Sequence, residues 1–349
     1  MKTIVTESVL PAFGLGDDIL EVNLFGSGLI NYTWNVQTRR GSFILQRIND
    51  SVFHEPQNIE HNIKLVAQYL KQNHPHYCFV APLEALDGNE MIYHRDAGFF
   101  RVFPFISESH SKDVVDTADQ AYEAAAQFGK FTRLLSGLDV SLLKVTIPFF
   151  HDLNLRYLQF LKALEHGNYD RIHESQHLID QCHKHDDIVT QYEKIKASDD
   201  FKLRVTHHDA KISNVLFNRE NKGICVIDLD TVMPGYFISD VGDMMRTYLS
   251  PVSEEEQDFS KILIRNDIYK AIVDGYYNEM KEELTEMEKE HFTYAGKFMI
   301  YMQALRFLTD HLNNDVYYGA KYEGHNFVRA GNQLTLLEKL IEKEPELAR

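Results

Sequence analysis

A polar run from Thr206 to Asn214 carries the residue types that a phosphoryl transfer requires. The run reads Thr-His-His-Asp-Ala-Lys-Ile-Ser-Asn, and a second acidic residue, Asp228, ends the apolar stretch that follows it. Phosphoryl transfer needs a carboxylate that orients the attacking hydroxyl and accepts its proton, a cation beside the transferring phosphoryl group, and oxygen ligands for Mg²⁺. Because this short segment and one strand end supply all of them, the pattern indicates phosphoryl-transfer chemistry.

Each residue of the pattern has a distinct expected role. We expect Asp209 to act as the base and to contact the acceptor hydroxyl, and Lys211 to place its charge beside the transferring group. Asn214 and Asp228 offer the hard oxygen ligands that Mg²⁺ prefers, while His207 would pack the loop. Any one of these residues alone is more often an ordinary surface residue. The joint pattern, followed by a predicted hairpin, favours catalysis.

Most strand signals lie in the first hundred residues. Short apolar and β-branched runs are separated there by glycines and by an Asp-Gly turn. Between the third and fourth runs, apolar residues recur at three- and four-residue spacing from Ile59 to Leu70, which predicts one amphipathic helix. The predicted strands are Glu21–Phe25, Tyr32–Gln37, Phe43–Ile48, Met91–His94 and Phe99–Phe105.

The chain after Ser107 has a helical pattern, with a boundary predicted at residues 106–111. The exception is a hairpin, Val215–Phe217 with Cys225–Asp228, which follows the polar run and places Asp228 at a strand end. Helices are predicted over 121–135, 153–164, 174–197, 266–282 and 285–312. The polar run should therefore lie in a loop between helices and a small sheet.

Charge and composition exclude several classes of partner. The chain has 36 Lys and Arg against 52 Asp and Glu, a net charge of −16, so attraction to nucleic acid or to anionic lipid is not expected. The most apolar stretch, residues 97–106, is too short to span a membrane and contains Arg101, which predicts a buried strand. No signal-peptide pattern opens the sequence, and three scattered cysteines do not indicate disulfides. We expect a cytoplasmic protein without nucleic-acid or membrane partners.

The chain resembles the aminoglycoside phosphotransferase and choline kinase family, which shares the protein-kinase fold, and within it the bacterial N-acetylhexosamine 1-kinases. The resemblance implies an α+β, bilobal fold: a small antiparallel-sheet lobe, residues 1–106, that binds ATP and ends in a hinge, and a larger, mainly helical lobe, residues 107–349, that holds the catalytic residues and the acceptor. ATP and Mg²⁺ are the implied cosubstrate and cation. The stretches that carry the resemblance are Phe25–Thr33, Phe43–Asn49, Leu203–Asp209, Ile227–Gly235, Asp240–Asp243 and Arg306–Leu308.

The nucleotide contacts are expected in the first lobe. The backbone of Gly26, Ser27 and Gly28, between two predicted strands, can approach phosphates closely because no large side chain intervenes. Phe103 and Phe105 lie in the implied hinge, whose backbone would meet the adenine edge. A dinucleotide-binding fold is excluded, because no G-x-G-x-x-G opens a helix with an acidic residue downstream.

One position departs from the family pattern. Where the family places a lysine that grips the α- and β-phosphates, this chain has Gln46, which cannot neutralise phosphate. Either Arg47 reaches the phosphates, although strand alternation points it to the opposite face, or Mg²⁺ and Lys211 carry more of the charge. Glu60 is the nearest candidate for the usual helix partner of that lysine, and an ion pair between Glu60 and Gln46 is not expected, because glutamine is uncharged.

The acceptor should meet Asp209 among residues of the helical lobe. Asp230 follows Asp228 by two positions and is predicted to point into that cleft, and Tyr317 in the loop after the last long predicted helix is the favoured ring contact. On that helix, Arg306 and Asp310 lie on an otherwise apolar face. They either form an internal salt bridge, because a buried charge is costly unless paired, or border the acceptor site.

Asp240 and Asp243 follow Pro234-Gly235 and are predicted to open a helix. The kinase-like resemblance implies that an aspartate here hydrogen-bonds the catalytic-loop backbone, which is a structural role. We expect that role for both residues rather than a place in the chemistry.

The function that the resemblance implies is an ATP-dependent kinase acting on the anomeric hydroxyl of an N-acetylhexosamine, GlcNAc or GalNAc. A kinase of another alcohol, such as choline, an amino alcohol or an aminoglycoside, is the alternative within the enzymes, and the net charge of −16 is compatible with a cationic acceptor. A non-catalytic kinase-fold binding protein is the alternative outside them. Asp209, Lys211, Asn214 and Asp228 are all present, which argues against it.

Overall fold

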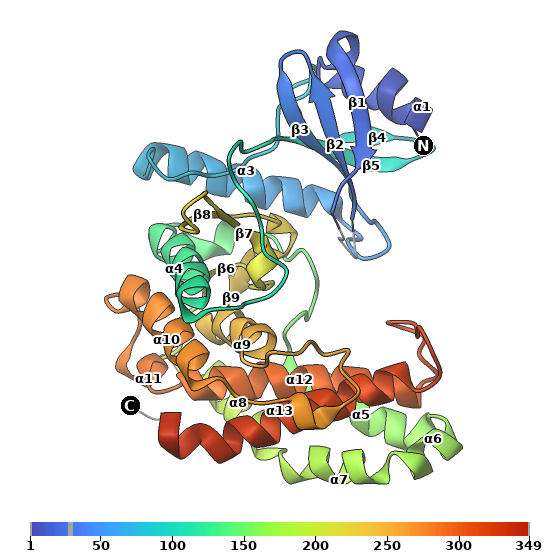
Figure 1. The fold of residues 1–349 in the computed structure, drawn as a ribbon, viewed down its shortest axis with the longest axis vertical. Coiled ribbons are helices and arrows are strands. Elements are labelled where there is room, and N and C mark those ends of the chain that lie inside the picture. Colours follow the sequence, from blue (N-terminus) through green and yellow to red (C-terminus); the bar gives the residue numbers. More distant parts are fainter. Residues whose placement is uncertain (1, 27–30, 348–349) are drawn as a thin grey trace.

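An antiparallel sheet forms the N-terminal part of the protein. The computed structural model describes residues 2–26 and 31–347, and the sheet within these ranges has five strands in the order β1-β2-β3-β5-β4 (Figure 1). The strands are β1 (Ile19–Leu24), β2 (Tyr32–Thr38), β3 (Gly41–Arg47), β4 (Ile92–His94) and β5 (Gly98–Pro104). One helix, α3 (Pro56–Asn73), separates the third and fourth strands. This is the element order predicted from the sequence.

The two faces of the sheet have different surroundings. Leu45, Phe100 and Val102 point to one face, which packs on a helical segment at the start of the chain. That segment was not predicted; it comprises α1 (Lys2–Ile4), a π-helical turn (Val5–Val9) and α2 (Leu10–Ala12). The neighbouring residues on each strand, Gln46 and Arg101 among them, therefore point to the other face. Gln46 lies opposite Arg101 in the β3–β5 pairing.

Helix α3 joins the sheet to the helices below it. Its apolar residues at positions 59, 63, 66 and 70 form one buried stripe, which belongs to the same hydrophobic cluster as the C-terminal helices. Asn62 on this helix donates hydrogen bonds to the carbonyl oxygens of Lys144 and Val232, both at 2.8 Å. The division at residues 106 and 107 stays a prediction, because α3 shares its core with the part that follows.

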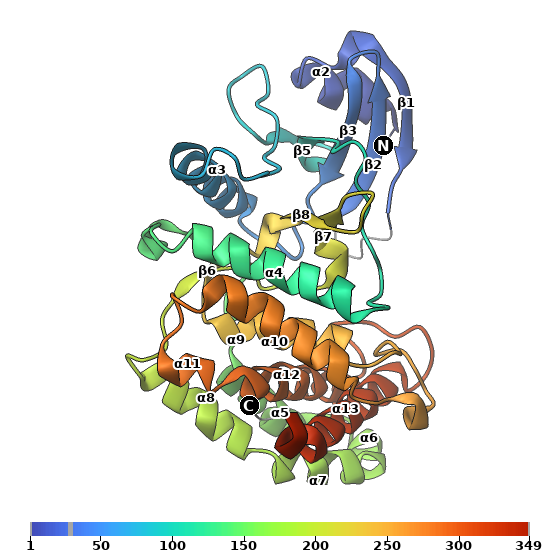
Figure 2. The same cartoon turned by 60° about the vertical axis from the view of Figure 1, so that its left-hand side comes forward.

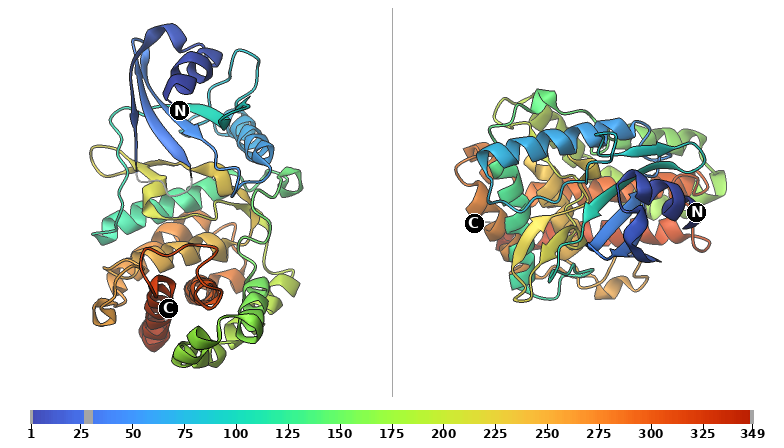
Figure 3. Two further views of the ribbon diagram at one scale, coloured as in Figure 1. Left: turned by 90° about the vertical axis from the view of Figure 1, so that its right-hand side faces the viewer. Right: turned by 90° about the horizontal axis from the view of Figure 1, so that it is seen from above.

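The rest of the described chain is mainly helical (Figure 3). Helix α12 lies at its centre and is buried on nearly all sides, and α4 and α10 run side by side (Figure 2). Gly129 and Gly275 allow that close approach, since an added Cβ would lie 3.0 Å and 2.5 Å from backbone oxygens of the facing helix. The helices are α4 (Ala118–Leu134), α5 (Leu153–His166), α6 (Tyr169–Glu174), α7 (Gln176–Lys184), α8 (Asp187–Ala197), α9 (Phe237–Tyr248), α10 (Asn266–Met280), α11 (Glu286–Lys289), α12 (Phe292–Leu312) and α13 (His325–Leu347).

Two of the predicted long helices are interrupted. The segment 174–197 is divided into the end of α6, then α7 and α8, and the segment 285–312 into α11 and α12. His185, at the break between α7 and α8, binds Glu338 of α13 at 2.8 Å. Thr285 begins α11 with a reciprocal capping box to Glu288. These contacts fix the helix ends, and helical periodicity alone did not reveal them.

Two short sheets bracket the polar run. Strand β7 (Val215–Phe217) pairs with β8 (Gly223–Val226), the predicted hairpin, and β6 (Arg204–Thr206) pairs with β9 (Met233–Gly235), a pair that was not predicted. The run between β6 and β7 is thereby held at both ends.

No helix among residues 2–26 and 31–347 is long and apolar enough to cross a membrane.

Candidate active site

The structure brings Asp209, Lys211 and Asn214 together in the loop between β6 and β7. Lys211 Nζ lies 2.9 Å from Asp209 Oδ2, and Asn214 Nδ2 donates to the same oxygen at 2.8 Å and to the Asp209 carbonyl at 2.9 Å. Burial acts to raise the pKa of Asp209, but the charge of Lys211 and these hydrogen bonds outweigh it and lower the pKa. Asp209 is therefore a carboxylate at neutral pH and can orient a hydroxyl group.

The backbone of this loop is fixed by hydrogen bonds to Asp240 of α9. The buried Asp240 carboxylate accepts hydrogen bonds from the backbone N–H groups of His207 at 3.0 Å and His208 at 2.7 Å. His208 has φ +66°, a left-handed conformation that a non-glycine residue adopts only when its surroundings hold it there. The role expected for Asp240 is thus confirmed. Asp243 instead pairs with Arg246 at 2.9 Å.

Asp228 follows β8 in a left-handed conformation with φ +62°. Among the described residues its carboxylate has no hydrogen-bond or ion-pair partner. Burial, with repulsion from Asp230 and Asp209, raises its pKa to about 7, while Lys211 and Arg101 act in the opposite direction. A half-buried carboxylate that is repelled by two others is stabilised by a bound cation.

The oxygen atoms near the loop fit Mg²⁺ bound together with a nucleotide. Both side-chain hydrogen bonds of Asn214 use Nδ2, so its Oδ1, like the Asp228 carboxylate, has no partner within the described part of the chain. Residues 2–26 and 31–347 contain no group of three or more His, Cys, Asp or Glu side chains that could hold a metal ion without further ligands. Mg²⁺ commonly takes one or two protein oxygens and completes its shell with phosphates and water, and this donor set matches that habit.

The predicted nucleotide contacts are only partly described. Gly26 is exposed with φ +78°, a conformation that suits glycine, whereas Ser27 and Gly28 lie outside the described residues. Phe105 makes an edge contact with Phe25, with ring centroids 6.5 Å apart, and Phe103 lies beside Arg101. Their contacts to a nucleotide stay predictions.

Gln46 has a cationic partner that the sequence analysis missed. Its Oε1 accepts hydrogen bonds from Arg101 Nε at 3.1 Å and Nη2 at 2.8 Å. Arg47, on the opposite face, lies over the ring of Tyr32, and Glu60 accepts hydrogen bonds from the backbone N–H groups of Glu90 and Met91. The sequence did contain a signal for this contact: Arg101 is the single charged residue in an apolar strand, and a buried arginine requires a polar or acidic partner.

Asp230 is the acidic partner of Arg101, and their ion pair connects the sheet to the helical part of the chain. Asp230 is 2% exposed, and Asn31 Nδ2 donates to its Oδ2 at 2.7 Å. The carboxylate is thus occupied by residues of the sheet part. A contact between Asp230 and the acceptor stays a prediction.

Arg306 and Asp310 do not pair with each other. The Asp310 carboxylate accepts hydrogen bonds from the backbone N–H groups of Tyr317 at 2.7 Å and Tyr318 at 2.8 Å, so it shapes the loop after α12. Arg306 donates to Gln303 at 3.2 Å and has no carboxylate partner among the described residues. Both residues line a cavity of about 350 Å³ with Arg156, Tyr317 and Tyr318.

Aromatic contacts connect this cavity to the catalytic loop. The Arg306 guanidinium lies 5.8 Å from the ring centroid of Phe150, which stacks on His151 at 4.4 Å. His151 Nδ1 in turn lies 3.3 Å from Nδ1 of His208, the residue before Asp209. Arg306 is thus connected to the loop that contains Asp209 through Phe150, His151 and His208.

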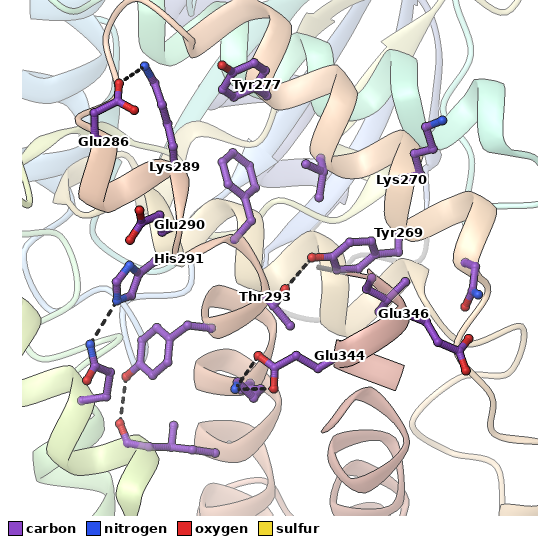
Figure 4. Close-up of a pocket in the computed structure, with 18 of the residues that line it drawn as sticks. Tyr269, Lys270, Tyr277, Glu286, Lys289, Glu290, His291, Thr293, Glu344 and Glu346 are labelled. Carbon is purple, nitrogen blue, oxygen red and sulfur yellow. Dashed lines mark hydrogen bonds and ion pairs between the residues drawn. The ribbon is translucent and has the colours of Figure 1, made fainter. Parts of the chain in front are cut away.

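A larger cavity lies elsewhere, between α8, α10, α11, α12 and α13 (Figure 4). It measures about 1180 Å³, and none of the predicted site residues lines it. Several of its polar side chains satisfy one another, as Lys297 does with Glu344 at 2.8 Å and Tyr269 with Thr293 at 2.6 Å. The loop between β6 and β7 is the better candidate for the active site, because Lys211 and Asn214 both lie within hydrogen-bonding distance of Asp209 there.

Comparisons with known proteins bear on the family and the fold of the chain. The sequence pattern of the phosphotransferase enzyme family matches residues 21–260, a range that contains the catalytic loop and Asp228. Spectinomycin phosphotransferase, solved with ADP and spectinomycin, is 13% identical, with a TM-score of 0.61 and 97% of each chain covered. The microcompartment-associated aminopropanol kinase is 15% identical, with a TM-score of 0.62 over 100% of this chain and 99% of its own.

A choline kinase from Cryptosporidium parvum Iowa II is similar at 14% identity, with a TM-score of 0.59 over 99% of this chain and 97% of its own. At such identities the likeness shows the fold alone. The predicted α+β arrangement, with a small antiparallel sheet before a larger helical part, is confirmed.

Proposed function

The chain belongs to the phosphotransferase enzyme family, and on that premise we propose that it is an ATP- and Mg²⁺-dependent kinase of the anomeric hydroxyl of an N-acetylhexosamine, GlcNAc or GalNAc. The products are ADP and the sugar 1-phosphate. Residues 1–106 act as the nucleotide lobe, and residues 107–349 provide the catalytic loop and the acceptor site.

The observation that carries the proposal is the cluster of Asp209, Lys211 and Asn214. Asp209 orients the acceptor hydroxyl and takes its proton, and Lys211, 2.9 Å away, places a positive charge beside the group being transferred. Asn214 and Asp228 would hold Mg²⁺, which supplies charge stabilisation to the phosphates when bound. Asp240 keeps the loop backbone in place for both tasks.

The charged groups that line the cavity beside Arg306 favour a neutral, hydroxyl-rich acceptor over a cationic one. A cationic acceptor such as choline or aminopropanol calls for acidic or aromatic side chains around its charge. Here Arg306 and Arg156 line the cavity, and the Asp310 carboxylate is already occupied by backbone N–H groups. Guanidinium groups beside tyrosine rings are suited to orienting sugar hydroxyl and carbonyl oxygens.

The proposal is tested by measuring ADP release with ATP and Mg²⁺ across GlcNAc, GalNAc, glucose, galactose, choline, 1-amino-2-propanol and spectinomycin. We expect turnover with the two N-acetylated sugars, and phosphorus NMR of the product should show phosphate at the anomeric carbon. Turnover with choline or the amino alcohol alone would establish the alternative kinase. Absence of both turnover and ATP binding would favour a non-catalytic binding protein.

Replacing Arg306 with methionine should raise the KM for the sugar about tenfold or more and change the KM for ATP by less than about twofold, because in this proposal the guanidinium binds the acceptor and does not contact the nucleotide. Steady-state kinetics with each substrate varied measures both constants. Arg133→Met is the matched control, since Arg133 pairs with Glu279 between α4 and α10 and lines neither cavity. Equal increases in both KM values would contradict the assignment of Arg306 to the acceptor.

A further inference from the structure

We propose that Arg101 of β5 provides the phosphate-binding cation that Gln46 of β3 cannot provide, with its Nη1 group donating to an α- or β-phosphate oxygen of the nucleotide. The inference rests on the proposed function, because it requires that the protein bind ATP.

The position of Arg101 follows from the register of the sheet. Arg101 is paired with Gln46 across β3 and β5, so both side chains leave the sheet on the same face. That face is opposite to the one covered by the N-terminal helical segment, where Leu45 and Val102 are buried. The guanidinium therefore points to the side where the catalytic loop lies, and its ion pair with Asp230 reaches that part of the chain.

The arginine is held rigidly in this place. Two of its nitrogen atoms donate to Gln46 Oε1, Asp230 neutralises its charge, and the ring of Phe103 lies 4.9 Å from its central carbon. Arg101 is 2% exposed, so it does not swing freely in solvent. A buried guanidinium fixed in this way can bind a ligand without a large loss of side-chain entropy.

One donor of the guanidinium is left without a partner. Nη1 of Arg101 is buried and makes no hydrogen bond to any described residue, although an unsatisfied buried donor is costly. The ion-pair partner Asp230 lies two residues after Asp228, the proposed Mg²⁺ ligand, and Arg101 is one of the two cations whose charge acts on Asp228. The unpartnered donor therefore lies beside the place where Mg²⁺ and the phosphates are expected, and a phosphate oxygen would satisfy it.

Two other cations that the sequence offers for the phosphates, Arg47 and Lys211, are less suited to this task. Arg47 follows Gln46 directly, but it lies on the opposite face over Tyr32. Lys211 is engaged with Asp209 in the catalytic loop. Asp230 forms the ion pair with Arg101 that an acidic helix residue usually forms with the phosphate-binding lysine. Glu60, the helix residue expected in that role, instead accepts hydrogen bonds from backbone N–H groups.

The test is a binding measurement that needs no turnover. Isothermal titration of the full chain with ATP plus Mg²⁺, with ADP and with adenosine gives three dissociation constants per variant. For Arg101→Met we expect the constants for ATP and ADP to rise about tenfold or more, and the constant for adenosine to change by less than about twofold. Arg47→Met, one residue from Gln46 on the other face, is the matched control and should bind all three as wild type does.

A structural role would give a different pattern. An equal loss of affinity for adenosine and ATP, or unchanged ATP affinity in a folded Arg101→Met variant, would overturn the proposal. Wild-type protein that binds none of the three would overturn the proposed function itself, which separates the two failures. The double variant Gln46→Lys/Arg101→Met, with a lysine on β3 directly opposite position 101 of β5, should recover at least part of the lost ATP affinity.

A second substitution covers the case in which Arg101→Met does not fold. Arg101→Lys keeps the positive charge next to Asp230 but has a single nitrogen in place of the guanidinium fork. We expect its ATP and ADP constants to rise about threefold or more with adenosine unaffected. ATP affinity equal to wild type in folded Arg101→Lys would overturn the proposed donation by Nη1.

Discussion

Asp209→Asn is expected to lower kcat by about two to four orders of magnitude while the protein keeps its fold and its affinity for ATP, since a general base contributes about that much to a proton transfer. Asparagine has nearly the same shape as aspartate but cannot accept the hydroxyl proton. It also removes the negative charge that Lys211 faces at 2.9 Å. The hydrogen-bond geometry of the loop is otherwise retained, because Asp240 holds the backbone from below.

Single-turnover ADP release with GlcNAc measures the chemical step for Asp209→Asn, and calorimetry with ATP measures binding. Asp199→Asn is the matched control, since Asp199 is exposed on the helical part and undergoes the same loss of charge. Wild-type turnover in Asp209→Asn would contradict its assignment as the base. A loss of ATP binding equal to the loss of turnover would place the residue in nucleotide binding instead.

Asp228→Asn is expected to weaken the binding of ATP with Mg²⁺ about a hundredfold or more, because it removes a charged oxygen ligand from a site that offers few of them. Asparagine is preferred to alanine here, since Asp228 has φ +62° and asparagine tolerates that conformation better. Calorimetric titration with ATP in the presence of Mg²⁺, and again in EDTA, isolates the part of the affinity that depends on the metal. Equal affinities for wild type and variant in Mg²⁺ would exclude Asp228 as a ligand.

In the absence of metal, Asp228→Asn should make the folded protein more stable than wild type, although it weakens nucleotide binding. Burial, with repulsion from Asp230 and Asp209, raises the pKa of Asp228 from 3.8 to about 7 in the folded protein. The ionised form is therefore disfavoured by folding, and wild type loses stability relative to the variant as pH rises from about 4 to about 7. Thermal melts in EDTA should show the Tm of Asp228→Asn rising above that of wild type over this interval. A gap that shrinks with rising pH would contradict the cause given for the shift.

The catalytic loop and the order of the elements could be predicted because their signals are local. Asp209, Lys211 and Asn214 lie within a few residues of one another, so their spacing in the chain already limits their separation in space. The strands and α3 likewise follow from alternation and from three- and four-residue spacing, which depend only on neighbouring residues. Asp240 could be assigned to the loop backbone through the family resemblance, and the contact is present.

The boundaries of the helices depended on contacts between distant segments. The break before α8 is accompanied by His185 binding Glu338 of α13, and Thr285 and Glu288 fix the start of α11. The β6–β9 pair joins residues nearly thirty positions apart through three residues of each strand, too few for a recognisable sequence pattern. Periodicity reports which face of a segment is buried, but it does not report where a distant side chain ends that segment.

The sequence by itself thus predicted phosphoryl-transfer chemistry, because the groups that this chemistry requires are close in the chain and their expected roles follow from their types. Only the tertiary structure decided which charges meet across the two parts of the molecule. It paired Arg101 with Gln46 and Asp230 and separated Arg306 from Asp310. The physical reason is that a buried charge must find a partner, and the fold, rather than the distance along the chain, determines which partners are within reach.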